Sequence, residues 1–307
     1  MRFIRNWAVA TFILTFLVII AGGVVRTTQS GMGCPDWPRC FGKWIPPTSA
    51  SELPADYEKY LRKQDIDHSF NAVHTWIEYV NRLLGALLGV FAVIQVASLI
   101  GKRRQLKQPY NFSLLFLLVV VLTGLFGAIV VKLNLAHLSI TVHLLFAVIL
   151  ILAQLALLLS LRAKMNTITV DAATKKALVA FLLILFVQCS LGTVVRMHVD
   201  DVSKELDYTN REAWLDNSPV AFLVHRSFSW AVLLLSLYMA WKNRNHAMLK
   251  SSFFILSGII LLIMATGIIL YEAGMPAAAQ PTHLLLATIA ITQGFSILLR
   301  AGKGSSR

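Results

Sequence analysis

Ionisable and amide side chains occur inside otherwise apolar stretches of this 307-residue chain. Placing such groups within a membrane-spanning helix is costly, so they are candidates for function. They gather near one end of four apolar stretches, and they are His74, Glu78, Asn81, Arg82, His143, His225, Arg226 and His283. Side chains of these types could bind a metal-bearing cofactor, transfer protons and pair with anions.

The histidines suggest the most specific chemistry. Two helices of a bundle that each present a histidine to the other can hold a heme iron between two imidazoles. His225 and His283 form one such pair, and His143 forms a second pair with either His74 or Asn81. A single histidine at a helix end is commonly an interfacial residue, but matched positions in a repeat favour ligation. Zinc is the weaker alternative, because no carboxylate or thiolate accompanies the histidines at ligand spacing.

Glu78 follows His74 by four residues and precedes Asn81 by three, so the three side chains share one helix face. A carboxylate about one turn inside the membrane could carry protons, or it could be an acid placed favourably at a helix N-terminus. Arginines near the helix ends could pair with heme propionates or anchor the helices at the interface. These arginines are Arg26, Arg82, Arg196 and Arg226.

Two cysteines, Cys34 and Cys40, lie six residues apart between the first two apolar stretches. On the oxidising side of a membrane, this spacing favours a disulfide, either structural or redox-active, over a metal site. The third cysteine, Cys189, lies within an apolar stretch and is predicted to be a buried thiol.

The elements that position these residues follow from composition. The chain is 57% hydrophobic and only 14% charged, which excludes an ordinary soluble domain. Backbone groups in lipid must be hydrogen-bonded internally, so apolar runs of about 20 residues are predicted to be helices. The chain is therefore predicted to be an all-α membrane protein with eight transmembrane helices. The runs fall at about 7–25, 73–100, 112–131, 139–161, 177–195, 220–241, 253–271 and 283–300.

Charge predicts the orientation of these helices. Lys and Arg gather in the short segments on one side, whereas most Asp and Glu lie in two long segments at 26–72 and 196–219. Both termini are therefore predicted to be cytoplasmic and both long loops to lie outside. The net charge of +13 then indicates topology rather than a nucleic-acid partner. The run at 7–25 is too long for a typical signal peptide, and no transit segment is present, so we expect a bacterial inner-membrane protein.

The second half of the chain repeats the first. Matched segments are Gly23-Val24-Val25-Arg26 with Gly192-Thr193-Val194-Val195-Arg196, Tyr79-Val80-Asn81-Arg82 with Leu223-Val224-His225-Arg226, Thr123-Gly124 with Thr266-Gly267, and Val142-His143-Leu144 with Thr282-His283-Leu284. Four helices per copy preserve the orientation. The halves are therefore predicted to be two tandem four-helix bundles related by a pseudo-two-fold axis near the membrane normal. Phe222 stands in the second copy where Glu78 stands in the first.

The segment from Gly22 to Cys40 carries a specific motif. It reads Gly22-Gly23-Val24-Val25-Arg26-Thr27 and continues into Ser30-Gly31-Met32-Gly33-Cys34-Pro35-Asp36-Trp37-Pro38-Arg39-Cys40. This segment resembles the first outer loop of the heme A synthase family. Glu78-Tyr79-Val80-Asn81-Arg82 and His225-Arg226 are similar to that family's signatures on its second and sixth helices. The resemblance extends over all eight predicted helices.

The resemblance implies a membrane oxidoreductase that oxidises the C8 methyl group of heme O to a formyl group and so makes heme A for terminal oxidases. It implies that the half at 166–307 holds a heme b cofactor between His225 and His283, which relays electrons. The half at 1–165 is then expected to receive heme O as substrate.

Within the substrate half, the resemblance implies that His143 binds the heme and that Glu78 is catalytic. One residue departs from the family pattern, because Asn81 stands where the family has a histidine. The repeat agrees, since Asn81 matches His225. His74, two turns earlier on the same face, is favoured slightly as the replacement ligand; alternatively the substrate iron has only His143.

Two other functions are compatible with two hemes in one bundle: a b-type cytochrome subunit for electron transfer, and a heme carrier or assembly protein. Glu78 and the cysteine loop occur only in the first half, and this asymmetry favours an enzyme. The expected partners are heme O, the heme O synthase that supplies it, membrane lipid and an unidentified electron acceptor. The sequence leaves a homo-oligomer open.

Overall fold

A computed structural model describes residues 1–61, 70–162 and 168–303. Within these ranges, eight helices are long and apolar enough to cross a membrane, which confirms the predicted number. The chain divides into two compact units, unit 1 at Met1–Leu161 and unit 2 at Arg162–Arg307. The pseudo-two-fold axis between the halves stays a prediction.

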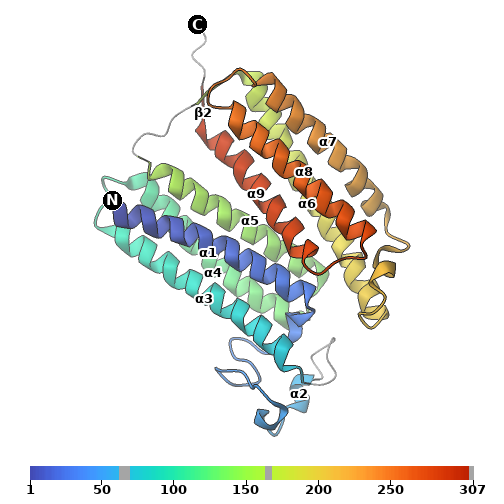
Figure 1. The fold of residues 1–307 in the computed structure, drawn as a ribbon. Coiled ribbons are helices and arrows are strands. Elements are labelled where there is room, and N and C mark those ends of the chain that lie inside the picture. The colour runs from blue at the N-terminus through green and yellow to red at the C-terminus, as the bar shows by residue number, and fades with distance from the viewer. Residues whose placement is uncertain (62–69, 163–167, 304–307) are drawn as a thin grey trace. The chain divides into compact units, whose positions relative to one another are not determined.

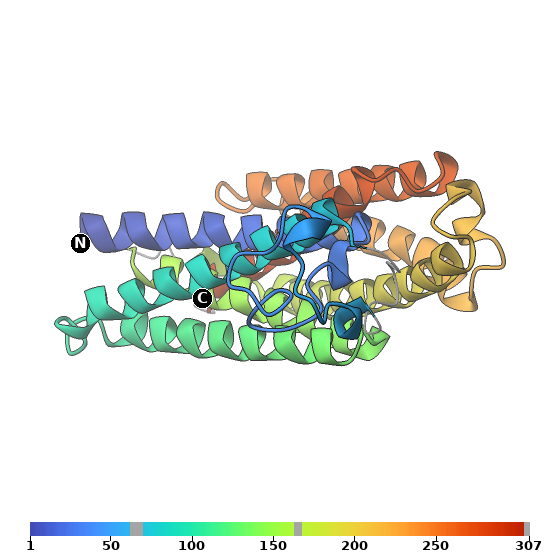
Figure 2. The ribbon, with the colours of Figure 1, turned by 90° about the horizontal axis from the view of Figure 1, so that it is seen from below.

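Unit 1 contains four long helices and a long loop between the first two. The helices are α1 (Arg2–Thr27), α3 (Ala72–Ile100), α4 (Lys107–Lys132) and α5 (His137–Ser160). The loop contains η1 (Ser30–Met32), η2 (Ala50–Glu52) and α2 (Glu58–Leu61). It gathers at one end of the unit (Figures 1 and 2).

The four long helices of unit 1 form a closed ring. Helix α1 contacts α3 and α5, and α4 contacts the same two helices, so α3 and α5 face each other across the bundle. The interior is mostly apolar, with Leu88 and Phe116 among its buried residues. Gln95 and Gln154 join α3 to α5 through two reciprocal amide hydrogen bonds of 3.0 and 2.9 Å. Both amides are fully buried, and their mutual satisfaction fixes the register of the two helices.

Unit 2 has the same order of neighbours. Its long helices are α6 (Ala172–Glu205), α7 (Val220–Lys242), α8 (Lys250–Glu272) and α9 (Ala279–Arg300). Helix α6 contacts α7 and α9, and α8 contacts the same two helices. The unit also contains η3 (Arg211–Leu215) and two strands, β1 (Ile168–Val170) and β2 (Ala301–Lys303), which pair in parallel. The sequence analysis missed these strands, because three residues are too few to display the alternation typical of a strand.

The second long loop is shorter than the sequence predicts. The charge pattern predicts a loop from Arg196 onward, but α6 continues to Glu205. Arg196 forms an ion pair with Asp200 one turn later, with Nη2 2.9 Å from Oδ1. Val199 packs against Trp214, and each is 1% exposed. This charge pair and this apolar contact support helix beyond the apolar run.

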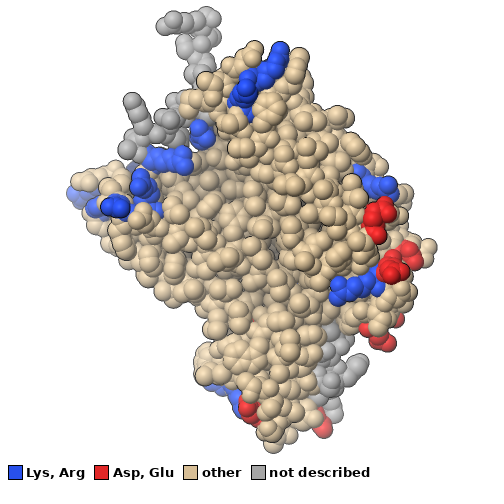
Figure 3. Space-filling model, in the orientation of Figure 1, with Lys and Arg blue, Asp and Glu red and all other residues tan. Residues whose placement is uncertain are grey.

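The flanks of the helices are apolar. On the face drawn in Figure 3, a broad uncharged surface covers the helices, and acidic side chains lie only towards the helix ends that carry the longer loops. On α4, for example, Leu118 and Leu125 are 55% and 53% exposed. Apolar exposure on this scale fits contact with lipid. The chain is a multi-pass membrane protein.

The amide pair of unit 1 generates a prediction for stability. In Gln95→Leu, the buried Oε1 of Gln154 loses its partner, so we expect a loss of about 1–3 kcal/mol in the free energy of unfolding. The double variant Gln95→Leu/Gln154→Leu should lose less than the single variant, because no amide is left unpaired. Thermal unfolding of the purified protein in detergent measures both. Strictly additive losses would contradict the mutual pairing.

Candidate functional site

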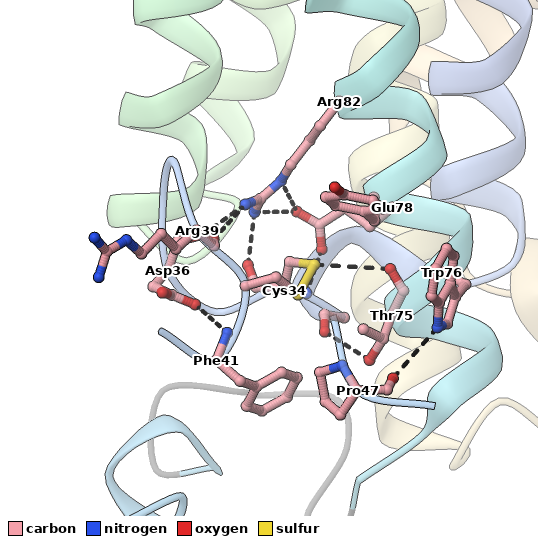
Figure 4. Close-up of a disulfide and its surroundings, with 12 residues drawn as sticks. Cys34, Asp36, Arg39, Phe41, Pro47, Thr75, Trp76, Glu78 and Arg82 are labelled. Atoms are coloured by element: carbon pink, nitrogen blue, oxygen red, sulfur yellow. Dashed lines mark hydrogen bonds and ion pairs between the residues drawn. A yellow bond between two sulfur atoms is a disulfide. The ribbon is translucent and has the colours of Figure 1, made fainter. Parts of the chain in front are cut away.

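A buried ion pair holds the first long loop against α3. Glu78 is 4% exposed, and among the described residues it is the one acidic side chain that is buried. Its Oε1 accepts hydrogen bonds from Nε and Nη2 of Arg82 at 3.1 and 2.5 Å. Its Oε2 accepts from the backbone N–H of Cys34 at 2.7 Å (Figure 4). Because a buried carboxylate is stable only when it is paired, these contacts fix Cys34 above the helix.

Arg82 uses its whole guanidinium within the protein. Nη1 donates to the carbonyl oxygens of Asp36 and Arg39 at 2.6 and 3.0 Å, and Nη2 donates to that of Cys34 at 2.7 Å. With the two bonds to Glu78, all five N–H donors of the side chain are used. Arg82 therefore joins the loop to α3, and the two roles predicted for it, pairing with a heme propionate and anchoring at the membrane interface, stay predictions.

The loop also packs directly on the backbone of α3. A Cβ at Gly33 would lie 2.5 Å from the carbonyl carbon and oxygen of His74, so only glycine fits there. Thr75 Oγ1 donates to the carbonyl oxygen of Gly33 at 2.9 Å. His74 itself lies in the first turn of α3, and its backbone N–H donates to Asn71 Oδ1 at 3.2 Å. The loop therefore covers the end of α3 that carries His74.

Cys34 and Cys40 form the predicted disulfide. Both cysteines are fully buried, and Phe41, 1% exposed, packs against them. Asp36 Oδ1 accepts from the N–H of Phe41 at 2.6 Å and closes the turn. Whether the disulfide exchanges electrons stays a prediction. Cys189 on α6 is only partly buried, which corrects the prediction of a buried thiol.

In unit 2, His225 of α7 is held in one tautomer. Its Nδ1 lies 3.1 Å from the carbonyl oxygen of Gln188, and a carbonyl can only accept. Nδ1 therefore carries the proton, and Nε2 keeps a lone pair. Gln188 Nε2 donates to the carbonyl oxygen of His225 at 2.7 Å and fixes the same contact from the other side.

His283 of α9 is held in the same tautomer by a different partner. Its Nδ1 lies 2.8 Å from Thr266 Oγ1, and that hydroxyl donates its one proton to the carbonyl oxygen of Ile263 at 2.8 Å. Thr266 therefore accepts from Nδ1–H, which leaves a lone pair on Nε2. Histidines that ligate metals are oriented in this way, through a hydrogen bond on the nitrogen that does not bind the metal.

Glycines let the histidine rings approach neighbouring helices closely. A Cβ at Gly192 of α6 would lie 3.2 Å from His225 Cε1, and one at Gly267 of α8 would lie 3.4 Å from His283 Cε1. The contact at Gly192 would be tight, whereas the contact at Gly267 would be close to an ordinary van der Waals distance. Each histidine ring of unit 2 therefore packs against a glycine of a neighbouring helix.

In unit 1, His143 of α5 has the equivalent glycine. A Cβ at Gly127 of α4 would lie 3.4 Å from His143 Cε1. The repeat in the sequence predicts Gly124 as the counterpart of Gly267, but in the structure Gly127 is the glycine that contacts the histidine ring. The glycine and the histidine on these helices then share one spacing of 140 residues from their counterparts.

Three polar side-chain atoms in unit 1 are buried without a hydrogen-bond partner among the described residues: Gln29 Nε2, Asn81 Oδ1 and His143 Nδ1. At the 140-residue spacing, Phe126 stands where Thr266 holds His283, which explains why His143 Nδ1 has no partner. Asn81 also lines a groove of about 640 Å³ between α1 and α3. The predicted heme-binding residues of unit 1 are therefore less constrained than those of unit 2.

The remaining arginines have different surroundings. Arg196 donates to Gln280 Oε1 and pairs with Asp200. Arg226 is exposed and lies over the ring of Tyr271 at 5.4 Å, while Arg26 lies in the last turn of α1. A propionate contact for these three residues stays a prediction.

Sequence reasoning missed two residues of the site, Gln188 and Gly127. Gln188 lies four residues before Gly192, and a lone amide one turn from a glycine in an apolar run is the signal that could have revealed it. Among the described residues, no group of three or more His, Cys, Asp and Glu side chains could hold a metal ion, so the zinc alternative gains no support.

Glu78 and Arg82 act as a clamp on the first long loop, and this clamp can be tested by substitution. Arg82→Ala removes five hydrogen bonds and leaves Glu78 buried without its cation, so the loop should open. We expect reduction of the Cys34–Cys40 disulfide by dithiothreitol to accelerate at least about tenfold, or about 1.4 kcal/mol. The matched control is Arg226→Ala, the repeat counterpart, which should leave the rate unchanged. Equal rates in all three proteins would exclude the clamp.

The chain was compared with known proteins. The family model described as cytochrome oxidase assembly protein, COX15-CtaA, matches residues 5–293. A protein named heme A synthase from Rhizorhabdus wittichii is 25% identical over 98% of this chain and 93% of its own length. The heme A synthase of Shewanella oneidensis is 26% identical over 91% of this chain and 92% of its own length. That of Orientia tsutsugamushi strain Boryong is 24% identical over 93% and 92%.

These matches run through both four-helix units and include the clamped loop. The match of the family model over nearly the whole chain agrees with the resemblance seen in the motifs. The chain belongs to the COX15-CtaA family of cytochrome oxidase assembly proteins.

Proposed function

We propose that the protein is a heme A synthase, which oxidises the C8 methyl group of heme O to a formyl group. The observation that carries this proposal is the family match over residues 5–293, together with similarity over nearly the whole chain to proteins named heme A synthase. The protein is accordingly a membrane oxidoreductase with heme as its substrate. The bacterial cytoplasmic membrane is its expected location, with the termini inside and the two longer loops outside.

Unit 2 is the proposed site of a heme b cofactor. His225 and His283 fit this group, because each is fixed through Nδ1 and keeps an Nε2 lone pair for iron. Bound there, heme b would supply one-electron transfer. Gln188 and Thr266 orient the two rings, and Gly192 and Gly267 give them room.

Unit 1 is the proposed substrate site. Heme O, with its long isoprenoid tail, would enter laterally from the bilayer, and His143 would bind its iron. We take water as the source of the inserted oxygen. Oxidation of the methyl group to an alcohol, and of the alcohol to a hydrated aldehyde, would then each consume one water molecule and release two electrons and two protons. The hydrated aldehyde would lose water to give the formyl group. The electrons would leave through unit 2 to an acceptor outside the chain.

Glu78 and Arg82 would act at the outer end of the substrate site. Glu78 is a buried base within unit 1, so it could accept protons released during the oxidations. Its bonds to Arg82 and to the N–H of Cys34 place that base under the loop. The loop in turn closes the site from the aqueous side.

The activity is tested by heme analysis. The full chain, produced in cells that make heme O but have no heme A synthase of their own, should yield heme A or its hydroxylated precursor in extracted hemes. His143→Ala should abolish both products while the unit 2 heme spectrum persists. Recovery of unaltered heme O alone from the wild-type protein would reject the enzyme and leave an electron-transfer or carrier protein.

The cofactor site is tested by spectroscopy. His225→Ala and His283→Ala should each abolish the low-spin heme spectrum of the purified protein, because one axial imidazole is lost. Gly192→Ala should perturb that spectrum, since its Cβ would lie 3.2 Å from His225 Cε1. Gly22→Ala is the matched control, because a Cβ there meets nothing within 4 Å. A low-spin spectrum that survives both histidine variants would exclude this ligand pair.

A further inference from the structure

We propose that unit 1 binds the substrate heme iron through one protein ligand, His143, and that the opposite axial position stays open beside Asn81. This inference rests on the proposed function and deepens it. It concerns how the two units differ, and it selects between the two alternatives that the sequence left for the residue opposite His143.

The ring of helices defines which residues face each other. In unit 2, the two histidines lie on α7 and α9, which are not neighbours in the ring. The matched positions in unit 1 are Asn81 on α3 and His143 on α5. Helices α3 and α5 also face each other, as the hydrogen bonds between Gln95 and Gln154 demonstrate. Asn81 is therefore the residue expected opposite His143.

His74 is displaced from this level. It lies seven residues before Asn81, which is about 10 Å along a helix that rises 1.5 Å per residue. Two axial nitrogens on one iron are only about 4 Å apart, since each metal–nitrogen bond is about 2 Å. His74 also cannot move inward, because its backbone packs against Gly33 of the clamped loop.

Open space lies beside α1 at Gly22. Gly192 lies against the ring of His225. Gly22 of α1 lies 170 residues before Gly192, the same spacing that separates Arg26 from Arg196, and a Cβ at Gly22 would meet no atom within 4 Å. Asn81 also lines the groove of about 640 Å³ between α1 and α3, together with Ala21 and Val24 of α1.

The chemistry of the two unpartnered atoms fits an open position. Imidazole is a usual ligand for heme iron, whereas amide oxygens suit harder ions. Asn81 Oδ1 is buried and has no partner among the described residues, so it is available to a small molecule at the iron. Its amide N–H groups could donate to such a molecule. Asn81 therefore contributes a hydrogen-bonding wall rather than a ligand.

This difference separates the two hemes by coordination. In unit 2, His225 and His283 would hold heme b through two imidazoles, which suits electron transfer. One imidazole in unit 1 leaves iron able to bind a small ligand, and the polarity of the open side then controls what binds. The substrate heme is thus expected to bind a small molecule at its iron, whereas the cofactor heme is not.

The test is the spin state of heme added to unit 1. Hemin is titrated into the purified full chain carrying its unit 2 heme, and difference optical and electron paramagnetic resonance spectra are recorded. The wild-type protein should add a high-spin ferric signal, and imidazole should convert it to low spin. Asn81→His should give the low-spin signal without imidazole, because Gly22 leaves room for the ring. Asn81→Gln, the matched control, should stay high-spin.

Two further variants fix the ligands. His74→Ala should leave the high-spin signal unchanged, and His143→Ala should remove it. A low-spin signal in the wild-type protein that His74→Ala converts to high spin would overturn the inference, as would an Asn81→His protein that stays high-spin. Heme A formation is measured separately, so the single-ligand inference and the proposed activity can fail independently. Heme A formed by a protein whose unit 1 heme is low-spin would reject only the single-ligand inference. A high-spin unit 1 heme without heme A formation would reject only the heme A synthase activity.

Discussion

A polar group buried in an apolar four-helix bundle must find its partner inside the protein, and this constraint arranges the whole site. In unit 2, the carbonyl oxygen of Gln188 and the hydroxyl oxygen of Thr266 accept hydrogen bonds from Nδ1–H of His225 and His283, so each histidine keeps a lone pair on Nε2. In unit 1, Glu78 is balanced by Arg82 and by the backbone of Cys34. In the proposed substrate site, Asn81 Oδ1 and His143 Nδ1 are buried and have no hydrogen-bond partner among the described residues.

The two units illustrate how a duplicated bundle acquires different roles through few substitutions. Arg82 and Arg226 are matched, but Glu78 is replaced by Phe222 in unit 2. Arg226 then lies over Tyr271, and Phe222 stacks on the same ring at 5.6 Å. One carboxylate therefore converts an arginine at a helix end into a clamp for a disulfide loop. Where Phe222 replaces this carboxylate in unit 2, the matched arginine contacts the ring of Tyr271 instead.

Much of this could be predicted from the sequence, because apolar runs of membrane length specify helices and the repeat aligns the histidines. The disulfide followed from spacing and from the side of the membrane. The contact between Glu78 and the N–H of Cys34 could not be predicted, since an irregular loop has no periodicity to define its path. The same applies to the five bonds of Arg82. The extension of α6 depended on Trp214, which packs on that helix from a later segment.

We propose that unit 2 would hold a cofactor heme between two histidines, and that unit 1 would bind the substrate heme through one histidine. An experimental structure of the full chain with heme O bound tests it most directly. We expect the iron of heme O on Nε2 of His143, with Asn81 facing it without a direct bond, and a second heme between His225 and His283. Heme O ligated by His74, or bound outside unit 1, would contradict the account.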